Sequence, residues 1–337
     1  MDFDMDQWLK DMVRPGKKRP LPILSFPGIQ ITEHTVEETV KSGLYQTECM
    51  KAVSDRFDMA AVLGLMDLSV EAEAFGSPVR YSIQEVPTVT AAIIQEEEEA
   101  EHLTIPEVGA GRTGECLNGI RKIAAQVKDR PILAGMIGPY SLAGRLLDMT
   151  EIMILCYEEP EMVETVLKKV TGFLCDYARA FKEAGADGIV MAEPAAGLLS
   201  PKLFREFSAP YAKQICQAAE EAGLTLIYHN CGMVEPLLED IADIPARGYS
   251  FGNAVNMKLV LEKMPKNRIV MGNLDPVGIL RNGTPDTVRA SVTQLLEQCG
   301  QYPNFLLSSG CDIPPVTPLE NLDAFFEAAD TFYKSVS

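Results

Sequence analysis

Eight short apolar runs recur along the chain, and each is followed by a longer segment that has helical character. The runs are almost continuously apolar rather than alternating, which is typical of parallel strands buried on both faces. They lie at residues 21–26, 60–66, 131–137, 188–192, 224–228, 249–254, 268–271 and 304–308. Alternating strands and helices predict a parallel sheet, and eight strands in 337 residues predict a (β/α)8 TIM barrel of the α/β class.

The helical segments carry start and stop signals. Residues 160–184 begin with Pro160 and are followed by Gly185, and residues 201–222 are followed by Gly223. Proline is favoured in the first turn of a helix and glycine just past its end, so both segments are predicted as helices. Two further helices are expected over residues 284–299 and 318–333.

We interpret residues 1–337 as a single barrel domain with two additions. Residues 1–18 have the pattern of an amphipathic helix that ends in a turn of Pro, Gly and Lys. The interval 68–130 is too long for one crossover, so it is expected to form an insertion after strand two. Its acidic run at 95–102 is expected to be solvated, because like charges repel one another.

The charge balance excludes several classes of partner. The chain has 30 Lys and Arg against 48 Asp and Glu, a net charge of −18, so neither nucleic acid nor an acidic membrane is an expected partner. No signal peptide or spanning segment is apparent, which indicates a cytoplasmic protein. Its eight cysteines are therefore expected to be reduced, as packing residues, metal ligands or nucleophiles.

Active sites of such barrels lie at the carboxyl ends of the strands, so the residues after each run are candidates for function. The most specific set is His229, Cys231 and Cys311. His229 and Cys231 are two positions apart in an extended segment, so their side chains point the same way. An imidazole and two thiols suit Zn²⁺, and three protein ligands leave a fourth tetrahedral position open, as in catalytic zinc sites. Each residue alone is also compatible with packing or a scaffold hydrogen bond.

Two carboxylates are candidates for catalysis. Glu193 ends the run GIVMA and is expected to face the barrel mouth. It could be a displaceable zinc ligand, a proton shuttle, a group that orients a ligand, or a cap on the following helix. Asp67 is the second candidate.

Four further polar residues at strand ends are candidates for substrate binding. Asn253, Asn273 and Tyr140 could donate hydrogen bonds to an anionic substrate or to a nucleotide-like tail, and Asp275 also lies at a strand end. The segment GPYSLAG at 138–144 could offer helix amides to an anion, although a tight turn before a helix explains it equally well.

Several of these segments resemble the uroporphyrinogen decarboxylase superfamily, over about residues 20–333. The similar pieces are GPYSLAG, the stretch 185–211, GNLDP at 272–276, and SSGCDIPPVTPLENLDAF at 308–325. The true decarboxylases have an arginine-rich segment near the amino terminus that binds substrate carboxylates. Here the corresponding residues 25–30 read SFPGIQ, without arginine. The His-x-Cys…Cys pattern is instead similar to the zinc motif of the corrinoid-dependent methyltransferase branch.

The resemblance implies a zinc enzyme that moves a methyl group between a methylcobamide and a thiol such as coenzyme M. His229, Cys231 and Cys311 would hold one zinc per chain. The sequence has no Asp-x-His-x-x-Gly cobalamin-binding motif, so the methylcobamide is expected on a partner corrinoid protein. The alternatives are a metal-independent decarboxylase-like lyase, in which Asp67 would stabilise charge, and a corrinoid- or metal-binding protein without catalysis.

Overall fold

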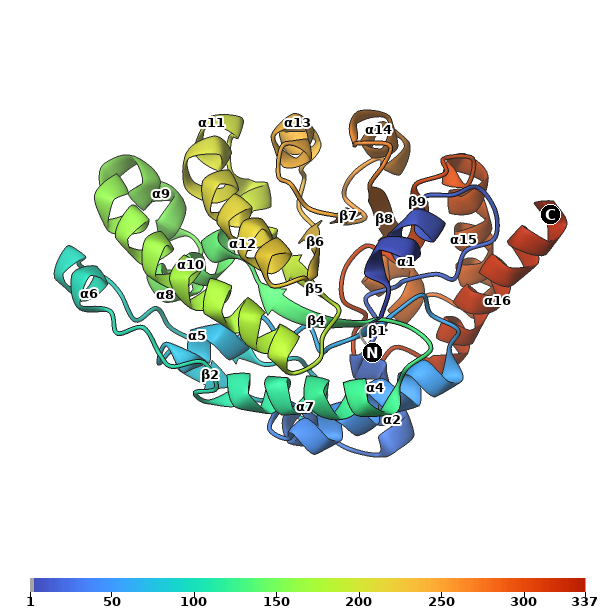
Figure 1. Ribbon diagram of the computed structural model, residues 1–337, viewed down its shortest axis with the longest axis horizontal. Coiled ribbons are helices and arrows are strands. Elements are labelled where there is room, and N and C mark those ends of the chain that lie inside the picture. Colours follow the sequence, from blue (N-terminus) through green and yellow to red (C-terminus); the bar gives the residue numbers. More distant parts are fainter. Residues whose placement is uncertain (1–2, 337) are drawn as a thin grey trace.

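The computed structural model describes residues 3–336, and its centre is a curled parallel sheet (Figure 1). Seven strands of the described chain form this sheet in the order β1-β4-β5-β6-β7-β8-β9. Their bounds are β1 Val62–Leu63, β4 Ile132–Ile137, β5 Gly188–Ala192, β6 Thr225–Asn230, β7 Gly248–Phe251, β8 Ile269–Leu274 and β9 Phe305–Ser309. The predicted α/β fold of the TIM-barrel type is confirmed.

The prediction that residues 21–26 form the first of the eight strands is wrong, because this segment is not a regular strand. Residues 21–26 lie between β9 and β1, where Leu21 N–H donates to the Leu307 carbonyl at 2.9 Å and Ala60 N–H donates to the Pro20 carbonyl at 2.9 Å. The segment closes the gap between the two outer strands without forming a regular ladder. Pro20 and Pro22 have no N–H to donate, which prevents this segment from forming a regular strand.

Helices surround the sheet (Figure 1). The longer ones are α4 Gly43–Arg56, α7 Arg112–Gln126, α10 Pro160–Glu183, α12 Ala209–Glu221, α15 Pro285–Cys299 and α16 Leu319–Val336. Shorter helices are α1 Met5–Met12, α2 Ile29–Thr32, α3 Val36–Val40, α5 Val70–Ala74, α6 Glu97–His102, α8 Pro139–Leu147, α9 Glu151–Glu158, α11 Pro201–Leu203, α13 Leu238–Ala242 and α14 Met257–Lys263. The helical turns η1 Phe26–Gly28, η2 Pro194–Leu198, η3 Phe204–Ser208, η4 Glu235–Leu237 and η5 Pro276–Arg281 complete the set.

The predicted helix stops are confirmed by the backbone. Helix α10 ends at Glu183, and Gly185 follows with φ +98°. Gly223, just past α12, has φ +75°. Both values fall in the left-handed region that glycine adopts without steric cost, which is why these residues end their helices.

The single helix expected over 201–222 is interrupted. It runs as α11, the π-helical turn η3 and then α12. Pro210 lies at the start of α12 and has no N–H for the carbonyl of Glu206, so the regular hydrogen-bond pattern cannot pass through this point. The wider π turn accommodates this local mismatch.

The long interval between β1 and β4 contains α5, α6, α7 and the short antiparallel pair β2 Val79–Arg80 with β3 Thr88–Val89. Helix α7 packs against α4 and leads directly into β4, as a crossover helix does. The predicted helix 1–18 is shorter, since α1 spans Met5–Met12; Met1 and Asp2 lie outside the described residues.

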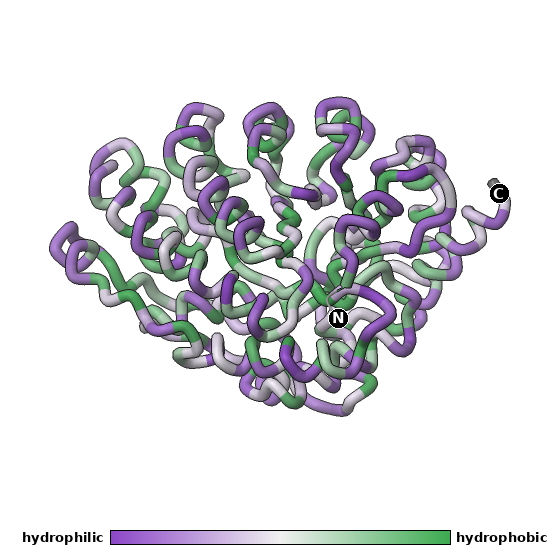
Figure 2. The backbone as a smooth tube through the Cα atoms, viewed as in Figure 1, coloured by the Kyte–Doolittle hydropathy of each residue, from purple (hydrophilic) through white to green (hydrophobic). Residues whose placement is uncertain are grey.

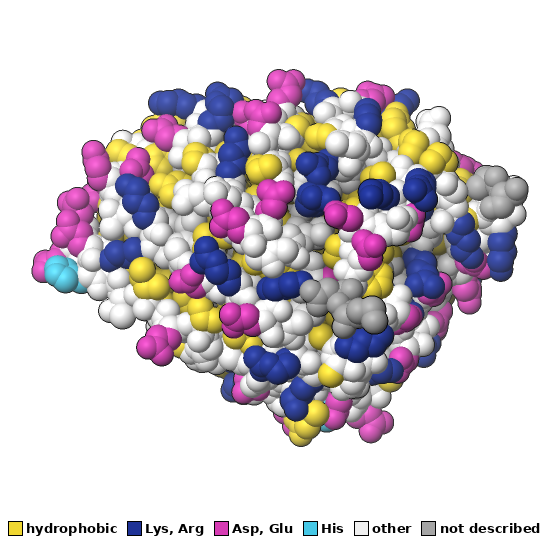
Figure 3. Space-filling view, viewed as in Figure 1, with side chains coloured by type: hydrophobic (Ala, Val, Ile, Leu, Met, Phe, Trp, Pro, Cys, Tyr) yellow, Lys and Arg dark blue, Asp and Glu magenta, His cyan; other side chains and the backbone are white. Residues whose placement is uncertain are grey.

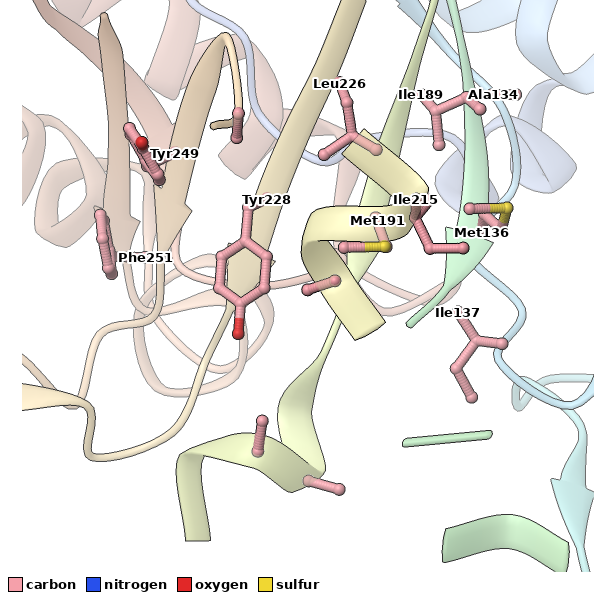
Figure 4. Packing of buried hydrophobic residues seen from close by; sticks show 14 of the residues in the cluster. Ala134, Met136, Ile137, Ile189, Met191, Ile215, Leu226, Tyr228, Tyr249 and Phe251 are labelled. Carbon is pink, nitrogen blue, oxygen red and sulfur yellow. The ribbon is translucent and has the colours of Figure 1, made fainter. Parts of the chain in front are cut away.

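Side chains of the strands alternate between two apolar layers. Ile189, Met191, Leu226, Tyr228 and Phe251 point outward to the helices (Figure 4). The alternate residues of these strands fill the barrel interior, together with Trp8 and Leu9 of α1. Trp8 Nε1 donates to the Ala60 carbonyl at 3.1 Å, which fixes α1 against the inner layer, and in Figure 1 the helix lies in front of the strands.

Hydrophobic segments concentrate in the strands and on the inner faces of the helices, and hydrophilic segments lie toward the outside (Figure 2). Acidic and basic side chains are interspersed over the face seen in Figure 3, and acidic ones gather near the tip formed by α6. Within residues 3–336, the helices are all too short or too polar to span a bilayer.

Candidate metal centre

Three side chains from distant parts of the sequence meet beyond the carboxyl ends of β6 and β9. One potential ligand atom from each of His229, Cys231 and Cys311 lies within 4.8 Å of the other two. No other group of three or more His, Cys, Asp or Glu residues within the described chain meets this criterion. The structure therefore brings together the three residues that the sequence predicts as metal ligands.

Strand alternation explains why these side chains converge. Ile227 of β6 belongs to the inner apolar layer, whereas Leu226 and Tyr228 belong to the outer one. His229 follows the alternation inward and is 2% exposed, and Cys231 is the next inward position along the chain. Cys311 comes two residues after β9 ends at Ser309, and it is partly buried like Cys231.

The imidazole of His229 is oriented by Ser250 of β7. Its Nδ1 lies 2.9 Å from the Ser250 hydroxyl, and Nε2 is buried without a hydrogen-bond partner. When Nδ1–H donates to the hydroxyl, Nε2 keeps a free lone pair. A buried imidazole nitrogen without a partner is unfavourable unless it has a ligand, which fits a metal at this position.

Close backbone packing fixes the loops that carry the cysteines. A Cβ atom on Gly252 would lie 2.5 Å from the Cα of Cys231, and one on Gly310 would lie 2.6 Å from the backbone nitrogen of Asn253. Only glycine at these two positions allows the backbone segments to come this close. The loop after β7 is thereby held against both the segment of Cys231 and the segment of Cys311.

The two thiols shift each other's pKa in opposite directions. The hydrogen bond from Cys311 lowers the pKa of Cys231 to about 7, and the same hydrogen bond, together with burial, raises the pKa of Cys311 to about 12. One thiolate is therefore available near neutral pH. Zinc prefers one or more thiolates together with neutral imidazole nitrogen, so this donor set suits Zn²⁺.

Glu193 lies outside this cluster. Its carboxylate accepts hydrogen bonds from Tyr140 N–H at 3.0 Å and Ser141 N–H at 2.7 Å, at the start of α8. It follows Ala192, an inward residue of β5, so alternation turns it outward. It therefore caps α8, which precedes it in the chain, rather than a following helix. Burial raises the pKa of Glu193 to about 7, and the hydrogen bonds from Ser141 and Tyr140 oppose that rise.

Three of the four predicted substrate-binding residues make contacts to other residues of the chain. The Tyr140 ring is fully buried and its hydroxyl lies 3.8 Å from Cys156 Sγ. Asn273 donates to the carbonyls of Gly252 and Val255, both at 2.9 Å, and thus ties down the loop after β7. Asp275 caps η5. Asn253 is exposed and lies beside Gly310, the residue before Cys311.

Asp67 is part of a buried ionic network. Arg112 of α7 contacts both Asp67 and Glu73, and the Arg112 and Asp67 side chains are only 6% and 3% exposed. Asp67 also accepts hydrogen bonds from the backbone and hydroxyl of Ser69. Its carboxylate is therefore fully engaged by neighbouring residues of the chain.

The sequence did not single out Ser250, Asp312 or Arg112. Ser250 is an ordinary strand residue until the β6–β7 register places it directly opposite His229. Asp312 adjoins Cys311 and has a buried Oδ1 without a hydrogen-bond partner; burial raises its pKa well above the ordinary value. The position of Asp312 beside a predicted ligand was the only signal available in the sequence.

Comparison with known proteins agrees with this fold. The uroporphyrinogen decarboxylase (URO-D) family profile matches residues 26–332, so the chain belongs to this family. The chain is 30% identical over 329 residues to "Methylcobamide:CoM methyltransferase MtbA" of Methanosarcina acetivorans, covering 93% of this chain and 95% of the relative. It is also 28% identical over 235 residues to a uroporphyrinogen decarboxylase of Prochlorococcus marinus, covering 66% of this chain and 64% of that enzyme.

A solved structure described as a methyltransferase from Methanosarcina mazei has a TM-score of 0.87 and 27% identity. The alignment covers 98% of this chain and 100% of that chain. The chain is thus a methyltransferase of the URO-D family, and the predicted family and enzyme class are confirmed.

Proposed function

We propose that this chain is a zinc-dependent enzyme that moves a methyl group between a methylcobamide on a partner corrinoid protein and a small thiol such as coenzyme M. The observation that carries the proposal is the convergence of His229, Cys231 and Cys311, with a buried imidazole nitrogen that lacks a partner. The methylcobamide:CoM methyltransferases among its relatives support the choice of methyl donor and acceptor.

The chain's own residues have separate tasks. His229 Nε2 and the sulfurs of Cys231 and Cys311 would hold the zinc, and Ser250 would keep the imidazole in the right tautomer. Three protein ligands leave one position for the substrate sulfur. Zinc bound there supplies Lewis acidity that keeps a substrate thiol, ordinarily of pKa about 8.5, in its thiolate form at neutral pH.

The methyl transfer needs no reactant other than the thiol and the methylcobamide. The thiolate sulfur forms a bond to the methyl carbon while the carbon–cobalt bond breaks, and both electrons of that bond stay with cobalt. The thiol proton is released to solvent. In the opposite direction, reduced cobalt attacks the methyl carbon of a methylated thiol and the thiolate departs.

The two ends of the barrel differ in what covers them. Helix α1 packs Trp8 and Leu9 into the inner layer near Ala60, which precedes β1. The candidate ligands lie beyond the opposite, carboxyl ends of the strands. The corrinoid protein would accordingly approach the loops after β6, β7 and β9.

Metal analysis tests the first half of the proposal. The purified chain should bind about one zinc, and Cys231→Ser and Cys311→Ser should lose it. Cys175→Ser is the matched control, because Cys175 is a partly buried cysteine of α10 outside the cluster. Equal zinc content in all four proteins would contradict the assignment.

Methyl transfer tests the second half. The zinc-loaded chain is mixed with methylcobalamin and 2-mercaptoethanesulfonate, and loss of the cobalt–methyl bond is followed by visible absorbance. We expect demethylation that depends on the thiol and that disappears in Cys231→Ser. Demethylation at the same rate without added protein, or none with any thiol and with a corrinoid protein present, would contradict the proposal.

An assay of the purified chain with uroporphyrinogen tests the lyase alternative, which the similarity to uroporphyrinogen decarboxylases motivates. Residues 25–30 of the chain contain no arginine for substrate carboxylates, so we expect no release of carbon dioxide from uroporphyrinogen. Release by the metal-free chain would favour the lyase.

A further inference from the structure

Asn230 lies between the candidate ligands His229 and Cys231, and it is fully buried. It is the last residue of β6. Along this strand Ile227 belongs to the inner apolar layer and Tyr228 to the outer one, so alternation turns His229 inward and Asn230 outward. The amide of Asn230 therefore faces away from the metal centre, and it can act on that centre only through the backbone that it holds.

The amide oxygen of Asn230 closes a turn around Cys231. Gly232 N–H donates to Asn230 Oδ1 at 2.9 Å. A hydrogen bond from a backbone N–H to the asparagine side chain two residues earlier defines an Asx turn, and the residue that this turn encloses is Cys231. The side chain of Asn230 thus restricts the backbone of Cys231 and, with it, the direction of the bond to its Cβ atom.

The amide nitrogen of Asn230 anchors the same turn to the neighbouring strand. Its Nδ2 donates to the Glu193 carbonyl at 2.7 Å, directly after β5 ends at Ala192. Backbone hydrogen bonds fix this point from both sides. Glu193 N–H donates to the His229 carbonyl at 2.8 Å, and Gly252 N–H donates to the Asn230 carbonyl at 3.1 Å. A single side chain therefore connects the turn that carries Cys231 to the end of β5.

The surroundings of this amide require both of its functions. A Cβ atom on Gly197 of η2 would lie 2.6 Å from Asn230 Oδ1 and 3.0 Å from the Cα of Gly232, so η2 packs directly against the turn. An asparagine supplies an acceptor for Gly232 N–H and a donor for the Glu193 carbonyl. An ionised aspartate would supply only the acceptor, and alanine would supply neither.

We propose that Asn230 is a positioning residue of the metal centre, whose side chain holds Cys231 where this cysteine can share one metal ion with His229 and Cys311. The inference rests on the proposed zinc centre and names a residue that sets its geometry. His229 lies within β6 and is paired with Ala192 and Ser250 on the neighbouring strands. Cys231 lies beyond the end of the strand, so loss of the turn should displace Cys231 more than His229.

Zinc affinity tests this role without any dependence on turnover. The affinity is measured by competition with a chromogenic chelator, and circular dichroism establishes that each variant is folded. We expect Asn230→Ala to weaken zinc binding by about 10- to 100-fold, as the loss of groups that orient metal ligands commonly does. Undiminished affinity in the folded variant would overturn the assignment.

Cobalt(II) supplies a readout that a merely stabilising side chain would not change. It accepts the same types of donor atom as zinc, but its incomplete d shell gives visible and charge-transfer absorption. The sulfur-to-cobalt absorption per bound ion reports the cysteine ligands. We expect Asn230→Ala to lose part of this absorption, as Cys231→Ser should. The full absorption per bound ion in Asn230→Ala would contradict a positioning role.

Asn304→Ala is the matched control. Asn304 is 1% exposed, and its Nδ2 donates to the carbonyls of Pro265 at 3.3 Å and Arg268 at 3.1 Å. It precedes Phe305 at the start of β9, at the opposite end of that strand from Cys311. Both alanine variants should lower the urea midpoint of the metal-free chain, but Asn304→Ala should keep the zinc affinity and the cobalt spectrum. Equal loss of zinc affinity in the two variants would indicate a general loss of stability and contradict a specific role.

Asn230→Asp is the second variant, which decides the matter if Asn230→Ala does not fold. It keeps an acceptor for Gly232 N–H but, when ionised, has no donor for the Glu193 carbonyl. We expect a zinc affinity below that of the unmodified chain and above that of Asn230→Ala. Affinity equal to that of the unmodified chain would contradict the anchoring of the turn to β5.

The unmodified chain separates this inference from the proposed function. If it binds neither zinc nor cobalt, the proposed metal centre fails and the role of Asn230 fails with it. If it binds one metal ion and Asn230→Ala binds that ion with the same affinity and spectrum, the metal centre stands and only the positioning role is overturned.

Discussion

His229 and Ser250 face one another on the neighbouring strands β6 and β7, with Nδ1 of the imidazole 2.9 Å from the serine hydroxyl. Both side chains are buried, so the hydrogen bond is shielded from water. It leaves Nε2 as the ring nitrogen without a hydrogen-bond partner, on the residue that groups with Cys231 and Cys311. The strand register thus fixes which ring nitrogen can act as a ligand.

Removal of this hydrogen bond should weaken the metal site without unfolding the barrel. Ser250→Ala takes away the partner of Nδ1, so the imidazole loses its fixed tautomer and orientation. We expect zinc affinity to fall by about 10- to 100-fold, measured by competition with a chromogenic chelator. Ser250→Thr retains a hydroxyl and should restore most of the affinity. Undiminished affinity in Ser250→Ala would show that the serine has no orienting role.

Gly252 should be intolerant of a side chain. In Gly252→Ala the new Cβ would lie 2.5 Å from the Cα of Cys231 and 2.6 Å from its carbonyl oxygen, so the ligand loop must shift. We expect loss of zinc binding together with a lower midpoint of unfolding, measured by metal analysis and circular dichroism.

The matched control is Gly172→Ala on the exposed face of α10, where a Cβ meets no atom within 4 Å. Alanine is the better helix former, so this variant should gain about 0.5–1 kcal/mol of stability and keep its zinc. Equal behaviour of the two variants would argue against the packing explanation.

Arg112 should be essential for the stability of the segment between β1 and β4. Arg112→Met leaves the buried Asp67 carboxylate without its cation, and Glu73 loses the same partner. Breaking a buried pair by removal of one member costs about 3–5 kcal/mol, measurable by urea unfolding. Arg289→Met, which removes a pair with exposed partners, should leave the unfolding midpoint unchanged. Similar midpoints for both variants would contradict this account.

Glu71 should make the stability depend on pH. Burial is the main cause that raises its pKa from 4.5 to about 7, and its Oε2 has no hydrogen-bond partner. Because the folded pKa lies above the unfolded one, the contribution of Glu71 is complete below about pH 4.5 and is lost as pH rises through about 7. Glu71→Gln should therefore match the unmodified chain at pH 4.5 and exceed its free energy of unfolding at pH 8 by on the order of 3 kcal/mol.

Urea unfolding at both pH values measures this difference. Glu297→Gln, on the exposed surface of α15, should show no such gain. A constant difference between Glu71→Gln and the unmodified chain across the pH range would contradict the effect of burial.

The order of strands and helices could be derived from the sequence because it depends on local patterns. Continuous apolar runs, Pro160 at a helix start and Gly185 past a helix end specify elements through interactions with near neighbours. The exception, residues 21–26, follows from a local feature as well: Pro22 cannot donate to a ladder. The sequence also showed that His229 and Cys231 carry metal-ligating atoms and that they are two residues apart.

Only the tertiary structure decided which polar residues share the site. Glu193 and His229 both come at the end of apolar strands, yet alternation turns Glu193 to the amides of α8 and His229 to Ser250 and the cysteines. Arg112 and Arg145 are both arginines in helices, but only Arg112 forms ion pairs with Asp67 and Glu73. The sequence by itself determined the overall architecture and the types of candidate metal ligands and catalytic groups, because these depend on residue type and local spacing. The face to which each side chain turns, and the partner that it meets, depend on strand register and on packing between segments far apart in the chain.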